Sequence, residues 1–153
     1  MDFRHTCNKM TPTVFFVPGL WEGPSVFNHV SSLLSKDGIK SESATLRSTG
    51  TISPGNPSMH DDILGIRADL EPTIARGEDV VLVLHSAAGF LGSAAFEGLA
   101  AKFRRERGEK GGVIGIVFIA AGILDVGQSH PPMAAFTVID VSCALSTGPR
   151  LYL

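Results

Sequence analysis

One stretch of the chain, residues 79–90, joins an apolar run to a serine and then to a series of small residues. The run over 80–84 is short, unbroken and β-branched, which is typical of a strand buried on both faces of a parallel sheet. His85 and Ser86 follow it, and a helical pattern begins at Ala88. A strand that turns sharply into a helix at a serine lifts the hydroxyl above the sheet edge and points the next N–H groups into the same space. Ser86 is therefore a candidate nucleophile; the alternative is an ordinary turn in which the serine caps the helix.

The rest of the chain alternates between short apolar strands and amphipathic helices. We expect strands over 14–17, 39–46, 80–84 and 113–121, and helices over about 25–38, 58–76 and 88–107. The second strand carries charged and hydroxyl side chains and suits a sheet edge, whereas the last is apolar throughout and suits a fully buried position. This alternation predicts an α/β fold with a doubly wound, mostly parallel sheet of about four or five strands.

Composition and charge limit the classes of function. A chain of 153 residues with 44% hydrophobic and 18% charged residues is long enough for one globular domain with a core. A net charge of −2 gives no basis for expecting nucleic acid or an anionic membrane as a partner. Cys7 and Cys143 do not have the spacing of a metal site, so we expect reduced thiols, no metal and no cofactor. The N-terminus does not resemble a signal peptide, and no apolar run reaches the ~20 residues that cross a bilayer, so the expected location is cytoplasmic.

Residues 84–89, Leu-His-Ser-Ala-Ala-Gly, resemble the nucleophile elbow of the α/β-hydrolase superfamily, whose usual form is Gly-x-Ser-x-Gly. Leu84 and Ala88 occupy the two glycine positions, and Gly89 comes one place later. Residues 14–21 resemble the strand and loop before the first helix in the small esterase and hydroxynitrile-lyase group, with proline where many members have histidine.

This resemblance implies the hydrolysis of carboxylic esters or related acyl compounds, with a small molecule as the substrate. Ser86 would be the nucleophile, and the backbone N–H groups of Leu20 and Ala87 would bind the oxyanion. Because both donors belong to the backbone, the Leu and Ala side chains do not conflict with the assignment.

The acid and the histidine of a catalytic triad are harder to place. The family order is serine, acid, histidine, and Asp125 and His130 are the only Asp-before-His pair after Ser86. The similarity covers residues 13–127, so we divide the chain into a flexible leader (1–12), a partial α/β-hydrolase domain (13–127) and a divergent tail (128–153), and we interpret the chain as truncated or altered after about residue 130.

Two hypotheses remain open. The first is an active serine hydrolase; the second is a catalytically inactive, truncated protein of the same fold that lacks the acid and histidine. Dinucleotide or phosphate binding is disfavoured because residues 18–23, Pro-Gly-Leu-Trp-Glu-Gly, do not form the glycine pattern that it requires. If no strand follows the one at 113–121, its apolar edge is exposed, and self-association through that edge is expected.

Overall fold

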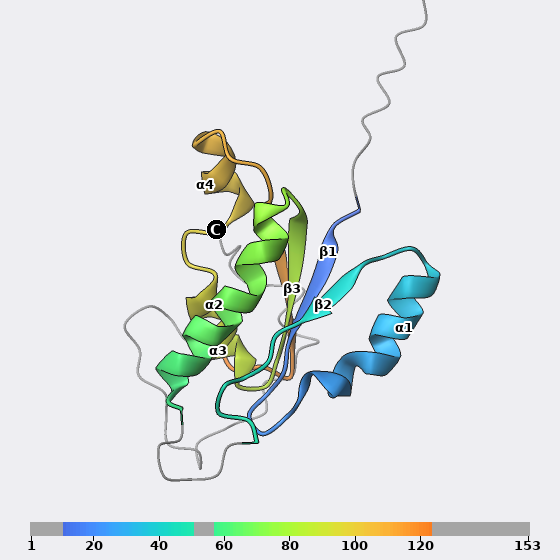
Figure 1. The fold of residues 1–153 in the computed structure, drawn as a ribbon, viewed down its shortest axis with the longest axis vertical. Coiled ribbons are helices and arrows are strands. Elements are labelled where there is room, and N and C mark those ends of the chain that lie inside the picture. The colour runs from blue at the N-terminus through green and yellow to red at the C-terminus, as the bar shows by residue number, and fades with distance from the viewer. Residues whose placement is uncertain (1–10, 51–56, 124–153) are drawn as a thin grey trace, which may run out of the picture.

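The computed structural model describes residues 11–50 and 57–123, which form a four-stranded sheet with helices on both faces (Figure 1). The strands are β1 (Thr13–Val17), β2 (Ser41–Ser43), β3 (Asp79–His85) and β4 (Gly112–Ile119). They lie in the order β2-β1-β3-β4, and every neighbouring pair is parallel. The predicted α/β class and parallel sheet are confirmed. The polar second strand does lie at an edge, although it is shorter than the predicted 39–46.

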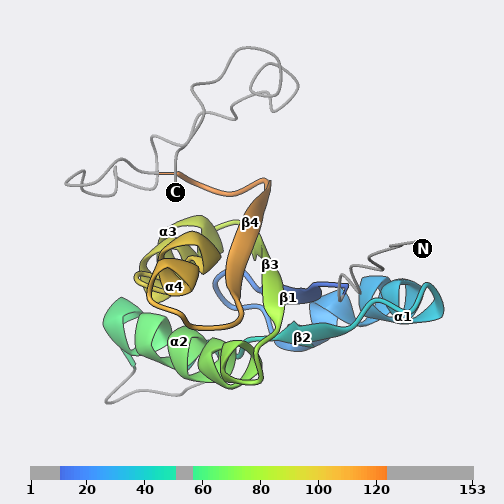
Figure 2. The same cartoon turned by 90° about the horizontal axis from the view of Figure 1, so that it is seen from above.

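The helices divide between the two faces of the sheet (Figure 2). The 3₁₀ helix η1 (Pro24–Phe27) and α1 (Asn28–Lys36) lie on one face, and α2 (Met59–Ala75), α3 (Ala88–Ala95) and α4 (Ala101–Glu106) lie on the other. The helix predicted over 88–107 is in fact two helices. Gly98 adopts a left-handed φ of 75° after α3, and Ala100 then forms an isolated parallel bridge with Val113, so the chain turns back to the sheet before α4 begins.

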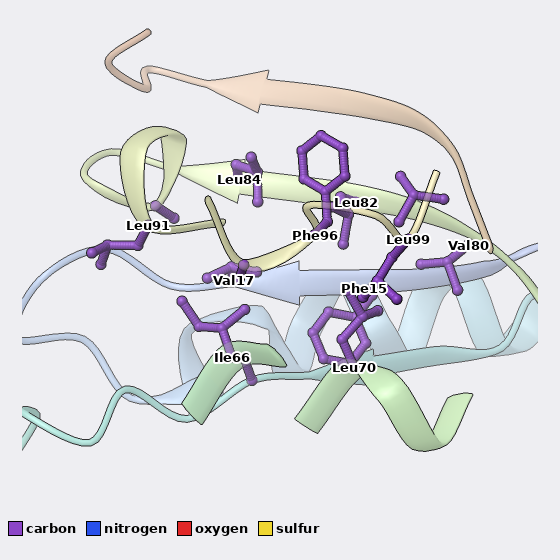
Figure 3. Close-up of a cluster of buried hydrophobic side chains, with 14 of the residues drawn as sticks. Phe15, Val17, Ile66, Leu70, Val80, Leu82, Leu84, Leu91, Phe96 and Leu99 are labelled. Atoms are coloured by element: carbon purple, nitrogen blue, oxygen red, sulfur yellow. The ribbon is translucent and has the colours of Figure 1, made fainter. Parts of the chain in front are cut away.

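The main core lies between the sheet and the α2–α3 layer (Figure 3). Alternate residues of each strand point to opposite faces, so Phe15 and Val17 enter this core while Phe16 faces α1. On the α1 face a smaller cluster forms, in which the rings of Phe16 and Phe27 stack with their centroids 4.5 Å apart. This alternation gives the sheet two apolar faces, each covered by its own helices, and the parallel direction of β1 and β3 brings the loops that follow them to the same end of the sheet.

The strand β4 is not fully buried as its sequence predicted. Its residues Val113, Ile116 and Phe118 pack on the main core. Ile114, Val117 and Ile119 are 44–47% exposed, and no described strand pairs with the outer edge of β4. The apolar run predicts two covered faces, but within the described part of the chain helices cover only one of them at this strand. Among residues 11–50 and 57–123, nothing covers this apolar edge and the apolar face beside it.

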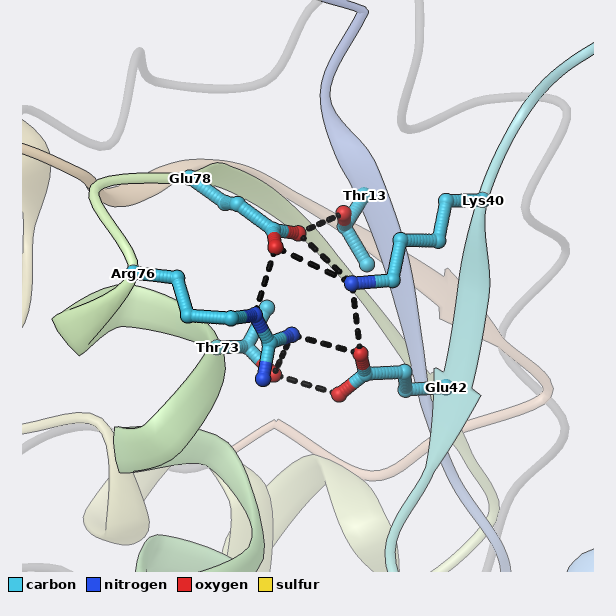
Figure 4. A network of polar contacts seen from close by, with 6 residues as sticks. All are labelled: Thr13, Lys40, Glu42, Thr73, Arg76 and Glu78. Atoms are coloured by element: carbon cyan, nitrogen blue, oxygen red, sulfur yellow. Dashed lines mark hydrogen bonds and ion pairs between the residues drawn. The ribbon is translucent and has the colours of Figure 1, made fainter.

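A network of charged and hydroxyl groups joins the amino-terminal ends of the strands, where β1 and β3 begin (Figure 4). Its members are Thr13, Lys40, Glu42, Thr73, Arg76 and Glu78. The hydrogen bond from Arg76 contributes most to lowering the pKa of Glu78; burial acts in the opposite direction, and bonds from Thr13 and Lys40 add to the decrease, so the pKa falls to about 2. The ionised Glu78 thus links β1, α2 and the start of β3.

We predict that Glu78→Gln lowers the free energy of unfolding at pH 7 by about 1–3 kcal/mol, the upper value corresponding to the whole pKa shift and the lower to screening of the exposed Arg76 and Lys40. A carboxylate with a lowered pKa stabilises the fold fully above its unfolded pKa and loses this effect as the pH falls toward its folded pKa. The difference between variant and wild type should therefore shrink between pH 4.5 and about 2. Urea unfolding across this range measures it. Glu71→Gln, which removes a surface i,i+4 ion pair with Arg67, is the control; an equal loss for Glu78→Gln at pH 7 and pH 2 contradicts the prediction.

We also predict that the chain self-associates through β4. An unpaired apolar edge pairs readily with another copy, and charged residues on such an edge prevent this. Val117→Lys combined with Ile119→Lys should lower the mass measured by light scattering toward that of the monomer. Met59→Lys, a change of a similarly exposed apolar residue on α2, should not. A wild-type chain that remains a monomer at all concentrations contradicts this prediction.

Candidate active site

Ser86 lies where β3 ends and α3 is about to begin, as the sequence predicted. It has a φ of 56°, which is uncommon for any residue except glycine. Its backbone is held on both sides, because the Ser86 N–H donates to the Ile119 carbonyl at 3.1 Å and the Ser86 carbonyl accepts from the Gly122 N–H at 3.2 Å. Such strained positions occur preferentially at functional sites and persist only where the surroundings fix them. The structure thus contains the sharp strand–serine–helix turn that the sequence predicted.

The small residues after Ser86 are required by close packing. A Cβ atom on Gly89 would lie 2.0 Å from the carbonyl oxygen of Gly122, so the first turn of α3 touches the backbone that follows β4. One turn later, a Cβ on Gly92 would lie 2.5 Å from the Leu84 side chain. Gly89 therefore cannot carry a side chain without displacing the backbone that follows β4, whereas a methyl group on Gly92 would meet only the side chain of Leu84.

The loop after β1 comes to the same place. Pro18 and Gly19 are buried, and a Cβ on Gly19 would lie 2.9 Å from the Cβ of Ser86. The next residue, Leu20, packs its side chain against the main core. The structure thus brings together two of the segments that the sequence analysis singled out: the loop that contains Leu20, and the turn that contains Ser86 and Ala87.

A side-chain hydrogen bond that sequence reasoning missed holds this loop. The Oε2 atom of Glu22 lies 2.7 Å from Nδ1 of His85 and accepts a hydrogen bond of 2.9 Å from the Gly19 N–H. Burial by itself would raise the pKa of Glu22, but the hydrogen bonds from His85 and Gly19 outweigh it and the pKa is lowered. The partners are 63 positions apart and no motif links them, so the sequence held no signal for this contact.

The predicted acid and base, Asp125 and His130, lie outside the described residues. Three of the five histidines lie within them. His29 and His60 are exposed near the starts of α1 and α2, and His85 binds Glu22. In the described ranges no group of three metal-ligating side chains comes together, and no helix is long and apolar enough to cross a membrane.

Comparison with known families identifies the group. A family model described as "Alpha/beta hydrolase family" matches residues 14–151. The chain belongs to this family. The matched range includes residues that we had set apart as a divergent tail, so the division of the chain near residue 127 stays a prediction. An α/β hydrolase of Aspergillus novofumigatus, nvfD, is 32% identical over 120 residues, which are 78% of this chain and 47% of the relative. The chain thus spans about half the length of the curated relative it matches.

Solved α/β-hydrolase-fold structures agree with this chain in fold. An extracellular α/β-hydrolase from a Paenibacillus species superimposes with a TM-score of 0.59 at 18% identity, covering 77% of this chain and 44% of the other. Tomato methylketone synthase I gives 0.54 at 18% identity, covering 72% and 40%. A mutant of polyneuridine aldehyde esterase gives 0.52 at 23% identity, covering 78% and 44%. At these identities the agreement concerns the fold alone.

The close packing of the elbow in this α/β hydrolase gives a matched pair of variants. Gly89→Ala forces a methyl group against a backbone carbonyl, which cannot move without displacing the chain after β4, and should lower the free energy of unfolding by about 2–3 kcal/mol. Gly92→Ala meets the end of a flexible leucine side chain, and alanine also favours the helix, so its loss should stay below about 1 kcal/mol. Urea unfolding compares the two; a larger loss for Gly92→Ala would show that this packing is described wrongly.

Proposed function

We propose that this chain is a serine hydrolase that cleaves small carboxylic esters, with Ser86 as the nucleophile. The observation that supports this most is the left-handed Ser86 at the carboxyl end of β3, facing the loop after β1 at van der Waals contact. Ligands of open α/β sheets bind at the carboxyl ends of the strands. A serine held in a strained turn at that end, in a member of this family, is best explained by chemistry at its hydroxyl.

In the proposed reaction, Ser86 Oγ attacks the carbonyl carbon of the ester while a histidine accepts the hydroxyl proton. The tetrahedral oxyanion receives hydrogen bonds from the backbone N–H groups of Leu20 and Ala87. The intermediate then expels the alcohol, which takes the proton from the histidine, and leaves an acyl group on Ser86. Water attacks this acyl-enzyme with the same histidine as base, releasing the carboxylic acid and restoring the serine. These steps use only protein groups and water.

The catalytic base is chosen among the five histidines of the chain. Among the described histidines, one is bound to Glu22 and two are exposed on helices. Because the family order places the acid and then the histidine after the serine, we assign the acid to Asp125 and the base to His130, which follow β4 in the chain. The alternative, a member of the family that keeps the fold without the chemistry, differs from this assignment in one measurable property, the reactivity of Ser86.

We predict that a fluorophosphonate probe labels the wild type once per chain, and that Ser86→Ala abolishes labelling. His130→Ala should slow labelling by about 10²–10⁴-fold, the usual contribution of a general base. Intact-mass spectrometry with time measures both, and His60→Ala, a change of an exposed histidine on α2, is the matched control. No labelling of a folded wild type contradicts the proposal and supports the inactive alternative. Labelling that persists in Ser86→Ala would assign the nucleophile to another residue.

A further inference from the structure

We infer that Glu22 is a positioning residue, whose carboxylate locks the loop over 18–22 against the end of β3 so that the Leu20 N–H stays aimed at the space beside Ser86. This inference rests on the proposed function, in which that N–H binds the oxyanion.

The contacts of Glu22 close the loop from three directions. Its Oε2 atom binds the Gly19 N–H within the loop and Nδ1 of His85 on β3. Its own N–H donates to the Gly19 carbonyl at 3.2 Å, and its carbonyl accepts from Oγ1 of Thr49, in the loop after β2, at 3.3 Å. One residue thus connects both sides of the turn to β3, the strand that directly precedes Ser86.

The loop needs these hydrogen bonds because its own side chains pack against the core on one side only. Leu20 packs on the core, but Trp21 is 80% exposed and has a left-handed φ of 66°. A tryptophan in this conformation is unfavourable by itself and persists only where other contacts fix the backbone. Because the Trp21 side chain supplies no such packing, the hydrogen bonds of Glu22 supply the restraint.

The hydrogen bond from Gly19 to Glu22 also determines which backbone N–H of the loop remains available to an oxyanion. Two successive N–H groups, those of Gly19 and Leu20, lie at the loop beside Ser86. The carboxylate binds the first of them and so fixes the plane of the Pro18–Gly19 peptide. The N–H of Glu22 binds the Gly19 carbonyl, which belongs to the same peptide as the Leu20 N–H, and so fixes the plane of that peptide. An oxyanion hole acts through donors that are oriented before the charge develops, so a loop free to turn at Gly19 would provide a weaker donor.

The contact with His85 has a consequence of its own. An ionised carboxylate only accepts hydrogen bonds, so His85 must carry a proton on Nδ1. In the neutral ring Nε2 is then the unprotonated nitrogen. Since His85 directly precedes Ser86 in the chain, this bond couples the loop to the residue that sets the nucleophile's position.

Variants at the two partners test the inference. Glu22→Gln keeps the volume but loses the charge, and should lower kcat about 10–100-fold with little change in KM, because a displaced oxyanion donor acts on the transition state. His85→Leu should act alike. His85→Asn, whose side-chain amide can donate from nearly the place of Nδ1, should recover most of the activity that His85→Leu loses. Glu109→Gln, which breaks ion pairs with Arg104 and Arg107 away from the site, is the control.

The proton position of His85 gives a readout that needs no activity. Long-range ¹H–¹⁵N NMR at pH 8 should show Nδ1–H in the wild type and in Ser86→Ala, and a shift toward Nε2–H in Glu22→Gln. An Nε2–H ring in the wild type overturns the inference even if Ser86 proves active. If the fluorophosphonate probe does not label the wild type but His85 carries its proton on Nδ1, the contact between Glu22 and His85 is supported and only the proposed function is refuted. If Glu22→Gln is as active as the wild type, or more active, the carboxylate does not position the loop, and its negative charge opposes the oxyanion.

Discussion

The steric constraint at Ser86 determines how the surrounding elements are arranged. A left-handed residue between a parallel strand and a helix reverses the direction of the chain within three residues, so strand and helix meet without room for side chains. Gly89 rests against the backbone that follows β4, and Gly19 rests against Ser86 itself. Three segments from separate parts of the sequence therefore meet at one point, and each has glycine or a small residue there.

The parallel sheet makes this meeting possible. Because β1, β3 and β4 run in the same direction, their carboxyl ends lie at one edge, and the loops that follow them converge. The core fixes the distances, since Leu82 and Leu84 from β3 and Leu91 from α3 pack in one cluster with α2 (Figure 3). The site is thus a consequence of strand direction and helix packing, and its chemistry depends on a few atoms that this frame holds in place.

Local pattern predicted most of the fold. The apolar run of β3, the serine and the small residues after it specify the turn by their own sequence, and the capping box of Ser58 and Asp61 specifies the start of α2. The predictions failed where the outcome depended on distant partners. The break between α3 and α4 follows from the bridge between Ala100 and Val113, and the exposed side of β4 depends on which helices reach it. The bond between Glu22 and His85 joins residues that only the folded sheet brings together.

The network around Glu78 and the turn at Ser86 lie at opposite ends of the same strand. A strand of this length separates them by roughly 20 Å, which is beyond the range at which most substitutions influence each other. Changes that strengthen the amino-terminal end can therefore accumulate without altering the geometry around the serine. During evolution, substitutions around the carboxyl ends of the strands can therefore change the chemistry of the site, while the network at their amino ends offsets the stability that such substitutions cost.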